Sequence, residues 1–475
     1  MKLSHHYAKH LPELVSPVRP SPLGGMRLAL VNRELADEFS LPKQWWESDT
    51  LVRGLSNPDF ELCRYAVAQK YGGHQFGQWN PYLGDGRGLL LGEITDLKGQ
   101  PNDLHLKGAG PTPYSRHADG RAVLRSTLRE YLGSEALHHL GIPSSRALCL
   151  FTSKQKVLRE QPEPGAMMIR TAQSHIRFGH FEYFFHAQEK RKLNALFEFT
   201  LNRYFRQCLK TSNPHASLLR SICLRTARMI ALWQAHGFVH GVMNTDNMSI
   251  HGITFDYGPY AFMEHFEPQA VFNHSDHQGR YAFDQQPGVA LWNLNALAWA
   301  FTDQCSKEEI VDILNQFEPT FIQQYQLKML QRLGLPEASE LALRLLNQWL
   351  DMIAGQQRDY HHTFRLLALT DPQQSKPALR DTFVDRDAFD NWWREYRALR
   401  TTVPTTQAEM LAVNPAVIAR TQFMQDAIVA AEQGDFSVAE QLLEALRRPF
   451  STKYDSHPLC QPPSNTQTIS LSCSS

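Results

Sequence analysis

Two short stretches near the middle of the chain combine carboxylate and amide side chains in a way that could support metal-dependent chemistry. The first, HGVMNTDN, covers residues 240–247, and the second, DYG, covers residues 256–258. Asn247 and Asp256 offer the hard oxygen ligands that Mg²⁺ or Mn²⁺ prefers, and the carboxylate of Asp246 could act as a general base. An Asx-rich turn followed by the end of a strand would have a similar composition without a catalytic role.

The order of these residues is similar to the catalytic loop of protein kinases, H-R-D-x-x-x-x-N, and to the D-F-G motif that follows it. His240 and Asn247 stand at the two ends of the loop pattern, while Gly241 and Val242 stand where kinases have arginine and the catalytic aspartate. Because valine cannot accept a proton, the usual base is absent. Asp246 is the natural substitute.

A glycine-rich segment, Gly84-Asp85-Gly86-Arg87-Gly88, precedes an expected strand and could bind phosphate. Glycines let backbone N–H groups approach phosphate oxygens closely, so Gly84, Gly86 and Arg87 are candidate contacts. A turn joining two strands is the structural alternative. The chain has no G-x-x-x-x-G-K-[ST] motif, which excludes a P-loop of the Walker type.

Three further cationic side chains could contact a nucleotide. Lys107 ends an expected strand and Glu130 lies in the middle of the next expected helix, an order like that of the strand lysine and helix glutamate that pair in kinases. Arg170 and Arg177 are candidate ligands of a triphosphate, because guanidinium groups form bidentate contacts with phosphate. Each of these residues could instead be an ordinary surface residue.

The elements expected to position these residues change character along the chain. Apolar patterning predicts strands at 89–94 and 103–107 within the first 180 residues. Apolar residues at helical spacing predict a helix over 121–140, with Asp119 and Gly120 at its N-cap. Beyond about residue 190 the chain is expected to be mainly helical, with helices at 193–209, 217–236, 290–301 and 341–353 and a loop-rich segment at 240–287.

A strand-rich part followed by a helical part favours an α+β fold over a doubly wound sheet. We predict a strand-rich N-terminal lobe over residues 1–180 that carries the nucleotide-binding loop. A helical lobe over 181–450 would carry the catalytic and metal-binding loop, with a ligand cleft between the lobes. The residues from 451 to 475 are expected to be a flexible tail.

Composition narrows the function classes. Lys plus Arg and Asp plus Glu both number 48, so no net charge favours nucleic acid as a partner. The start of the chain lacks an apolar signal segment, and no stretch approaches the roughly 18 consecutive apolar residues of a membrane span. We therefore expect no membrane association and a cytoplasmic location. The seven cysteines form no C-x-x-C pair, which argues against a structural zinc site.

Four long strings of the sequence together resemble the SelO family, called YdiU in bacteria. They are YGGHQFGQWNPYLGDGRG (71–88), LHLKGAGPTPYSRHADGRAVLRSTLREYL (104–132), HGFVHGVMNTDNMSIHGITFDYGPY (236–260) and NHSDHQGRYAF (273–283). The resemblance runs from about residue 60 to 300, with similar helical character beyond.

The resemblance implies a protein-kinase-like two-lobed fold with a C-terminal helical extension. It also implies transfer of AMP from ATP to Ser, Thr or Tyr hydroxyls of protein substrates, with release of diphosphate, from an ATP bound in the inverted sense so that its α-phosphate faces the acceptor. UMP transfer from UTP with Mn²⁺ is associated with bacterial members, so the choices between ATP and UTP and between Mg²⁺ and Mn²⁺ stay open.

The same resemblance implies roles for individual residues. Asn247 and Asp256 would bind the divalent ion, and Asp246 would accept the proton of the attacking hydroxyl. Glu130 would hold Lys107 in a structural ion pair. The nucleotide contacts would be Gly84, Gly86, Arg87, Lys107, Asp119, Gly120, Arg170, Arg177 and Asp256.

Two other functions remain open because Val242 replaces the usual base. One is a catalytically silent, nucleotide-binding pseudokinase scaffold, against which the intact metal pair argues. The other is an ordinary protein phosphotransferase, against which Val242 itself argues. Some family members end in a C-x-x-selenocysteine or C-x-x-C pair, whereas this chain has Ser470 and Cys473 there. A redox switch within the chain is therefore not expected.

Overall fold

Eight strands form one antiparallel sheet within the residues that the computed structural model describes, namely 3–335, 337–463, 469 and 471. The path through the sheet is β1 (Val15–Pro17), β3 (Val67–Gln69), β6 (Gly88–Thr95), β7 (Pro101–Lys107), β10 (Pro162–Ala172), β9 (Arg146–Leu158) and β2 (Arg27–Val31), with β8 (Ala122–Val123) beside β10. Every pairing between these strands is antiparallel, which confirms an α+β arrangement and excludes a doubly wound sheet.

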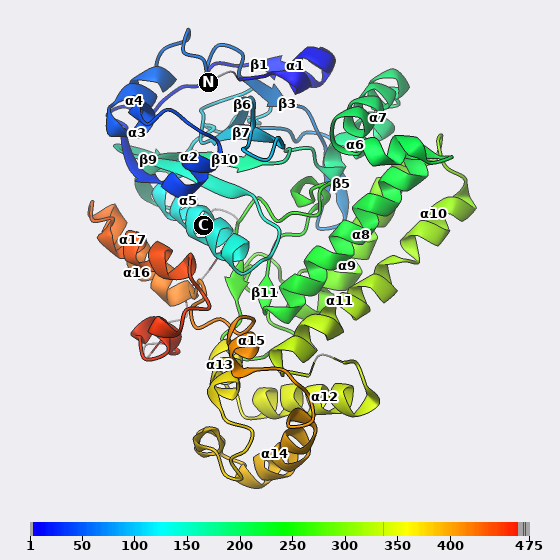
Figure 1. The fold of residues 1–475 in the computed structure, drawn as a ribbon. Helices are drawn as coiled ribbons and strands as arrows, with labels where there is room; N and C mark the ends of the chain where they lie inside the picture. The colour runs from blue at the N-terminus through cyan, green and yellow to red at the C-terminus, as the bar shows by residue number, and fades with distance from the viewer. Residues whose placement is uncertain (1–2, 336, 464–468, 470, 472–475) are drawn as a thin grey trace.

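The sheet is covered on both faces (Figure 1). Helices α2 (Arg33–Glu38), α3 (Gln44–Glu47) and α4 (Thr50–Leu55) pack on one face, against a core that includes Met167 and Ile169. Helix α5 (Leu124–His139) packs on the other face, against a core that includes Met168. This division follows from the alternation of side chains along a strand.

The register of the sheet decides which polar residues face α5. Lys107 lies opposite Met168 in the pairing of β7 with β10, and residues directly opposite each other point to the same face. Arg170 follows two residues after Met168 and therefore shares that face. Two cations of the sheet consequently point toward the helix that carries Glu130.

Helix α5 begins later than the sequence predicts. Its N-cap is Val123, and no side chain caps it. Residues 122–123 instead form strand β8, because Ala122 and Val123 pair with β10. The prediction that Asp119 and Gly120 sit at the N-cap is therefore wrong. Asp119 lies in the loop before β8, where its carboxylate accepts the backbone N–H of Arg121 at 2.9 Å.

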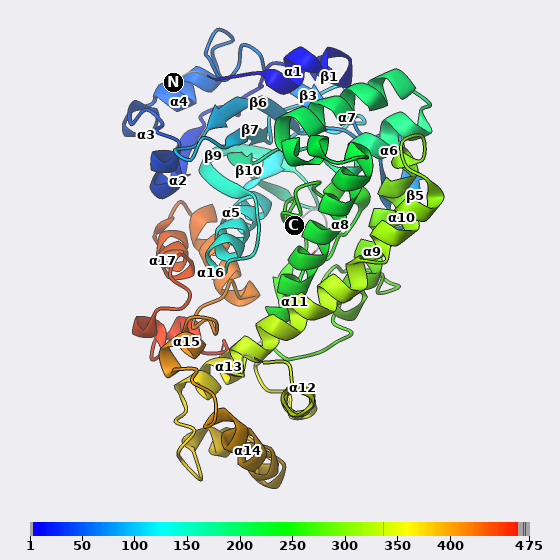
Figure 2. The same cartoon turned by 45° about the vertical axis from the view of Figure 1, so that its right-hand side comes forward.

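The chain after β10 is mainly helical, as predicted. Figure 2 shows α8, α9 and α11 running side by side. The helices are α6 (Phe178–His186), α7 (Lys190–Tyr204), α8 (Pro214–Ala235), α9 (Gln286–Ala298), α10 (Lys307–Leu314), α11 (Phe317–Arg332), α12 (Glu340–Gly355), α13 (Tyr360–Leu369), α14 (Arg386–Arg400), α15 (Gln407–Leu411), α16 (Thr421–Glu432) and α17 (Ser437–Leu446), with α1 (His6–His10) at the start of the chain.

Short 3-10 helices and two-stranded ladders connect the long elements. The ladders are β4 (Gly73–Gln75) with β5 (Gln78–Asn80), and β11 (Phe238–Val239) with β12 (Ala261–Phe262). The 3-10 helices are η1 (Pro12–Leu14), η2 (Arg206–Lys210), η3 (Thr245–Asn247), η4 (Phe283–Gln285), η5 (Trp299–Phe301), η6 (Ala378–Thr382), η7 (Thr452–Tyr454) and η8 (Pro458–Cys460).

The end of the chain returns to its beginning. Helices α16 and α17 pack against α5, as Figure 1 shows, and Arg447 donates a hydrogen bond to Asn32 at 3.0 Å. The segment from Ser451, predicted to be a flexible tail, contains η7 and η8 and buries Tyr454 and Cys460. Cys473 lies outside the described residues.

Neither a membrane-spanning helix nor a disulfide occurs in the part of the chain that the structure describes. No helix there is both long enough and apolar enough to cross a lipid bilayer. The six cysteines found there are buried and free of disulfides.

Candidate active site

A pocket of about 930 Å³ brings together residues from both parts of the chain. Nearly all residues that the sequence singles out line it, namely Gly84, Gly86, Arg87, Lys107, Asp119, Gly120, Arg170, Arg177, Asp246, Asn247 and Asp256. Glu130 lies behind this lining and contacts Lys107. The pocket therefore joins the glycine-rich segment, the sheet face toward α5 and the two stretches at 240–258.

Glu130 stands between two cations of the sheet. One of its carboxylate oxygens accepts Lys107 Nζ, and the other accepts Arg170 Nη1 at 2.8 Å. These cations keep the pKa of Glu130 low, at about 2, although burial by itself would raise it. Burial lowers the pKa of Lys107 to about 8, against the pull of Glu130. Buried charges of this kind are stable only when paired.

Asp256 belongs to the same network of ion pairs, because Arg170 contacts both Glu130 and Asp256. Its Oδ1 accepts Arg170 Nη1 at 2.7 Å, and its Oδ2 accepts Arg177 Nη1. Arg177 also donates to the backbone oxygen of Asp246 at 2.6 Å. Asp256 has a φ of 61°, in the left-handed region that residues other than glycine seldom adopt. Such backbone strain clusters at functional sites.

The β11–β12 ladder explains why residues 246 and 256 meet. Its two strands close the loop that begins at His240 and ends at Tyr260. Inside the loop, His240 Nε2 donates to the backbone oxygen of Phe255 at 3.1 Å, which holds the first stretch beside the second. Burial lowers the pKa of His240 to about 4, so the ring is neutral and carries its proton on Nε2.

The side chains of Asn247 and Asp246 leave oxygen atoms available. Asn247 Nδ2 donates to the backbone oxygen of Val242 at 3.1 Å, so its Oδ1 is directed elsewhere. Asp246 Oδ1 is buried and has no hydrogen-bond partner among the described residues. Burial raises the pKa of Asp246 to about 6. A hard divalent cation fits this set of amide and carboxylate oxygens.

In the glycine-rich segment the lack of a Cβ allows close packing, a role that the sequence prediction did not include. Gly84 has a φ of 120°, and a Cβ there would lie 2.7 Å from the ring of Tyr114. A Cβ on Gly86 would lie 2.8 Å from the backbone oxygen of Tyr114. The N–H groups of Asp85 and Gly86 already donate to backbone oxygens. These glycines make room for the Tyr114 loop, so they shape the pocket rather than offer a row of free N–H groups.

Several residues of the pocket are not among the candidates that the sequence predicts. Arg159 forms a bidentate ion pair with Asp119 at 2.9 and 3.0 Å. Tyr71 supports Arg177, whose guanidinium lies 4.9 Å from the ring centre. Asp85 and His105 contact each other at 3.4 Å. No local motif marks Arg159, and although Tyr71 opens the first of the four strings (71–88), nothing in its local sequence indicates the contact with Arg177, which long-range folding makes. Asp85, by contrast, stands inside a segment that the sequence singles out.

The start of α6 lies against the loop that carries Asp246. A Cβ on Gly179 would collide with the backbone oxygen of Gly72 and lie 3.5 Å from Cα of Asp246. Gly72 also donates its N–H to the backbone oxygen of Gly179 at 3.1 Å. The close approach of these backbones therefore requires glycine at position 179.

We expect Gly179→Ala to destabilise the protein by about 1–3 kcal/mol, because the added methyl group overpacks a rigid backbone contact. Activity should fall with it, since the displaced segment adjoins Asp246. Gly288→Ala is the matched control: Gly288 also lies in the first turn of a helix, and its Cβ would meet nothing within 4 Å. Urea unfolding of both variants checks this, and equal midpoints would contradict it.

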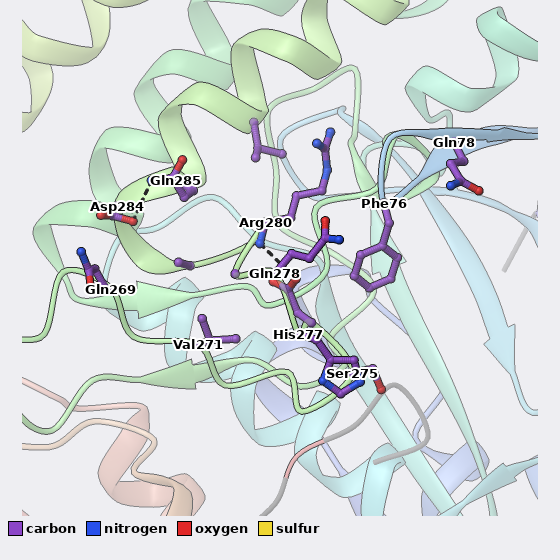
Figure 3. A pocket seen from close by; sticks show the side chains of 14 residues that line it. Phe76, Gln78, Gln269, Val271, Ser275, His277, Gln278, Arg280, Asp284 and Gln285 are labelled. Atoms are coloured by element: carbon purple, nitrogen blue, oxygen red, sulfur yellow. Dashed lines mark hydrogen bonds between the residues drawn. The ribbon is translucent and has the colours of Figure 1, made fainter.

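A second pocket of about 820 Å³ lies near the same loop (Figure 3). Phe76 and Gln78 from the β4–β5 hairpin line it together with residues between 269 and 289. Asn244 connects it to the loop of Asp246: its Oδ1 accepts the backbone N–H of Phe76 at 3.2 Å and the hydroxyl of Tyr281 at 2.6 Å. The hairpin thus borders both pockets, because Gln75 lines the first and Phe76 lines the second.

Comparison with known proteins decides the family. The model of the family "Protein adenylyltransferase SelO" matches residues 2–447. The chain belongs to the SelO family. A protein nucleotidyltransferase YdiU of Pseudoalteromonas atlantica is 51% identical over 480 residues, and one of Marinomonas sp. is 45% identical over 480 residues. One of Salmonella paratyphi A is 44% identical over 488 residues. Each alignment covers all of both chains.

Membership of the SelO family confirms the resemblance predicted from the four sequence strings and makes the chain an enzyme of nucleotidyl transfer. The SelO match includes every residue that lines the pocket of about 930 Å³. That pocket is therefore the candidate active site of this SelO protein.

Proposed function

We propose that the chain transfers AMP from ATP, or UMP from UTP, to Ser, Thr or Tyr hydroxyls of other proteins and releases diphosphate. The observation that carries this proposal is the position of Asp246: a carboxylate with a raised pKa lies beside the metal-ligating candidates Asn247 and Asp256, while Val242 lines the same pocket and can accept no proton. Membership of the family of protein adenylyltransferase SelO, and relatives that are protein nucleotidyltransferases, support nucleotidyl transfer to protein.

We further propose that the sheet-bearing part and the helical part are the two lobes of a protein-kinase-like fold. The ion pair between a strand lysine, Lys107, and a helix glutamate, Glu130, supports this, because kinases use such a pair to orient phosphates. The lobes would cover residues 1–180 and 181–450. The packing of α16 and α17 on α5 would then add C-terminal helices to the first lobe.

The cations of the pocket would bind the triphosphate. Lys107, Arg87, Arg170 and Arg177 lie around one cavity, and diphosphate as a leaving group needs such charge neutralisation. Arg170 and Arg177 at present hold Asp256, so phosphate would compete with that carboxylate for their N–H groups. Gly84, Gly86, Asp119 and Gly120 would complete the nucleotide contacts.

Asn247 and Asp256 would hold Mg²⁺ or Mn²⁺. The ion would supply positive charge beside the phosphates when bound. The protein's own residues would position the two ligands. Arg177 orients Asp256, and the β11–β12 ladder fixes both ligands on one loop.

Asp246 would remove the proton from the acceptor hydroxyl. With a pKa of about 6 its carboxylate is mostly ionised at neutral pH and remains a better proton acceptor than an ordinary aspartate. Its unpartnered Oδ1 supports this role, because a buried carboxylate oxygen without a donor is ready to accept one.

Labelled nucleotides test the reaction type. ATP or UTP carrying the label on the α-phosphate should label acceptor proteins, because the α-phosphate stays with the transferred nucleotide. Label that arrives only from the γ-phosphate would establish ordinary phosphotransfer instead. Nucleotide binding with no transfer of either label would establish the silent scaffold, and mass spectrometry of the labelled protein would identify the acceptor residue.

We expect nucleotide affinity to fall as pH rises above about 8. Lys107 loses its charge through that range in the free protein, and the charged form binds phosphate. The decline should approach about tenfold per pH unit beyond the pKa. Calorimetric titration with ATP between pH 7 and 9.5 measures it. Lys107→Arg is the control, since guanidinium keeps its charge over this range, and an unchanged decline in that variant would contradict the assignment.

A further inference from the structure

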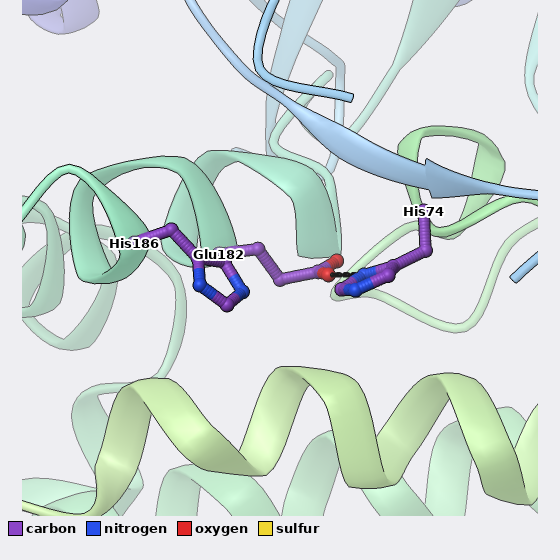
Figure 4. A group of neighbouring side chains, drawn as sticks. All are labelled: His74, Glu182 and His186. Atoms are coloured by element: carbon purple, nitrogen blue, oxygen red, sulfur yellow. Dashed lines mark hydrogen bonds and ion pairs between the residues drawn. The ribbon is translucent and has the colours of Figure 1, made fainter. Parts of the chain in front are cut away.

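Three potential metal ligands gather outside the nucleotide pocket, at the contact between the β4–β5 hairpin and α6 (Figure 4). They are His74 on β4 and Glu182 and His186 on α6. Their candidate ligand atoms all lie within 4.8 Å of one another, and His74 Nδ1 lies 2.5 Å from Glu182 Oε2. None of the three is among the described residues that line the nucleotide pocket.

Secondary structure places these side chains together. Glu182 and His186 are four residues apart on α6, so they project from the same helix face. His74 is held opposite them because its backbone N–H donates to Thr245 Oγ1 at 2.7 Å. The rings of Trp79 and Trp292 pack on His74, with centroids 5.2 and 5.3 Å away, and restrict its movement.

The burial of the Glu182 carboxylate is a second observation that indicates a bound ligand. The residue is 1% exposed, and its Oε1 is buried with no hydrogen-bond partner among the residues that the structure describes. Leaving a buried carboxylate oxygen unpaired is costly. A simple hydrogen bond between His74 and Glu182 would join the hairpin to the helix, but it satisfies only Oε2. A cation bound by the three side chains would neutralise this buried carboxylate.

We propose that His74, Glu182 and His186 form a binding site for a transition-metal ion of the zinc type. Two imidazoles and one carboxylate are a ligand set of protein zinc sites that leaves the remaining position to water. Imidazole favours Zn²⁺ over Mg²⁺ and Mn²⁺, which prefer oxygen ligands. The prediction of no zinc site rested on cysteine spacing alone and did not consider this cluster.

Metal at this cluster would cross-link the hairpin to α6. Both elements adjoin the loop of Asp246: a Cβ on Gly73 would lie 2.8 Å from Asp246 Oδ1, and Gly179 of α6 approaches its Cα. The ion would thus hold together the two elements that adjoin this loop, without contacting the nucleotide. The site does not depend on the proposed function, because its ligands are separate from those assigned to the nucleotide and its metal.

Zinc binding to the full chain tests the proposal without any assay of activity. Apo-protein is titrated with Zn²⁺ in competition with a chromogenic chelator, and its melting temperature is measured with and without Zn²⁺. His186→Gln is the main variant because this side chain is exposed and its loss should spare the fold. We expect at least about a tenfold weaker affinity for zinc and loss of the Zn²⁺-dependent rise in melting temperature. His74→Gln should behave alike.

Two controls separate this site from others. His215→Gln removes a half-buried histidine elsewhere and should keep wild-type zinc affinity. Asp256→Asn alters the nucleotide pocket and should also keep it. Equal zinc affinity in wild type, His186→Gln and His74→Gln would overturn the proposal, as would wild-type protein that takes up no zinc. Zinc lost in Asp256→Asn but kept in His186→Gln would assign the ion to the nucleotide pocket and equally overturn it.

Discussion

Asp256→Asn should reduce nucleotidyl transfer by about 10²–10³-fold or more, because this carboxylate has two roles in the pocket. The carboxylate is the proposed metal ligand and also the common partner of Arg170 and Arg177. Removing one preorganised electrostatic group from a water-excluded site costs this much. Initial rates with α-labelled ATP at several Mg²⁺ and Mn²⁺ concentrations measure the loss.

At position 256, substitution by asparagine is a more specific test than substitution by alanine because of the backbone conformation there. Asp256 has a φ of 61°, which asparagine tolerates and alanine does not, so Asp256→Ala would mix strain with the loss of the ligand. Asp284→Asn, an exposed aspartate in η4, is the matched control and should leave the rate unchanged. Wild-type activity of Asp256→Asn at low metal concentration would contradict the proposed metal site.

Asp246→Asn should lower the rate of transfer by about 10²–10⁴-fold, the range that general base catalysis contributes. Nucleotide affinity should change little, because the contact that Arg177 makes here is with the backbone oxygen of Asp246 rather than its carboxylate. The structure of the loop should survive, since asparagine matches aspartate in shape and Gln75 can still contact it. Single-turnover rates and ATP titration by calorimetry measure the two quantities separately.

The separation of rate from affinity is the decisive feature of this variant. A loss of nucleotide affinity as large as the loss of rate would mean that Asp246 binds nucleotide or metal and does not act as the base. Full activity would remove it from the mechanism. Gln75→Ala provides the control, because Gln75 Nε2 lies 3.4 Å from Asp246 Oδ2, and its loss should cost far less than loss of the carboxylate.

Predictions of secondary structure agree with the structure where local interactions set the element, and they differ where contacts with distant segments set it. The order of strands before helices is confirmed, and β6, β7, α8, α9 and α12 lie close to their predicted ranges, because apolar periodicity is a local property. Gly237, with a φ of 58°, follows His236, the C-cap of α8. The start of α5 and the tail from Ser451 differ, because pairing of β8 with β10 and burial of Tyr454 depend on distant segments.

The residues of the pocket likewise include some that the sequence indicates and some that only folding brings there. Motifs, residue types and the family resemblance together indicated eleven of its residues, namely Gly84, Gly86, Arg87, Lys107, Asp119, Gly120, Arg170, Arg177, Asp246, Asn247 and Asp256, while the roles of those residues stay predictions. The roles of Arg159 and Tyr71 could not be found, since their contacts with Asp119 and Arg177 join residues that are far apart in the sequence.

The sequence by itself indicated the family and the class of reaction, through the resemblance of its four long strings to the SelO family, and it offered candidate residues for binding phosphate and metal through residue type and spacing. Only the tertiary structure decided that Glu130 stands between Lys107 and Arg170, which requires the register of β7 with β10 and the packing of α5. It alone joined Asp256 to Arg177 and His74 to Glu182. Electrostatic contacts act over a few ångströms, and folding, rather than position in the chain, sets which charges come that close.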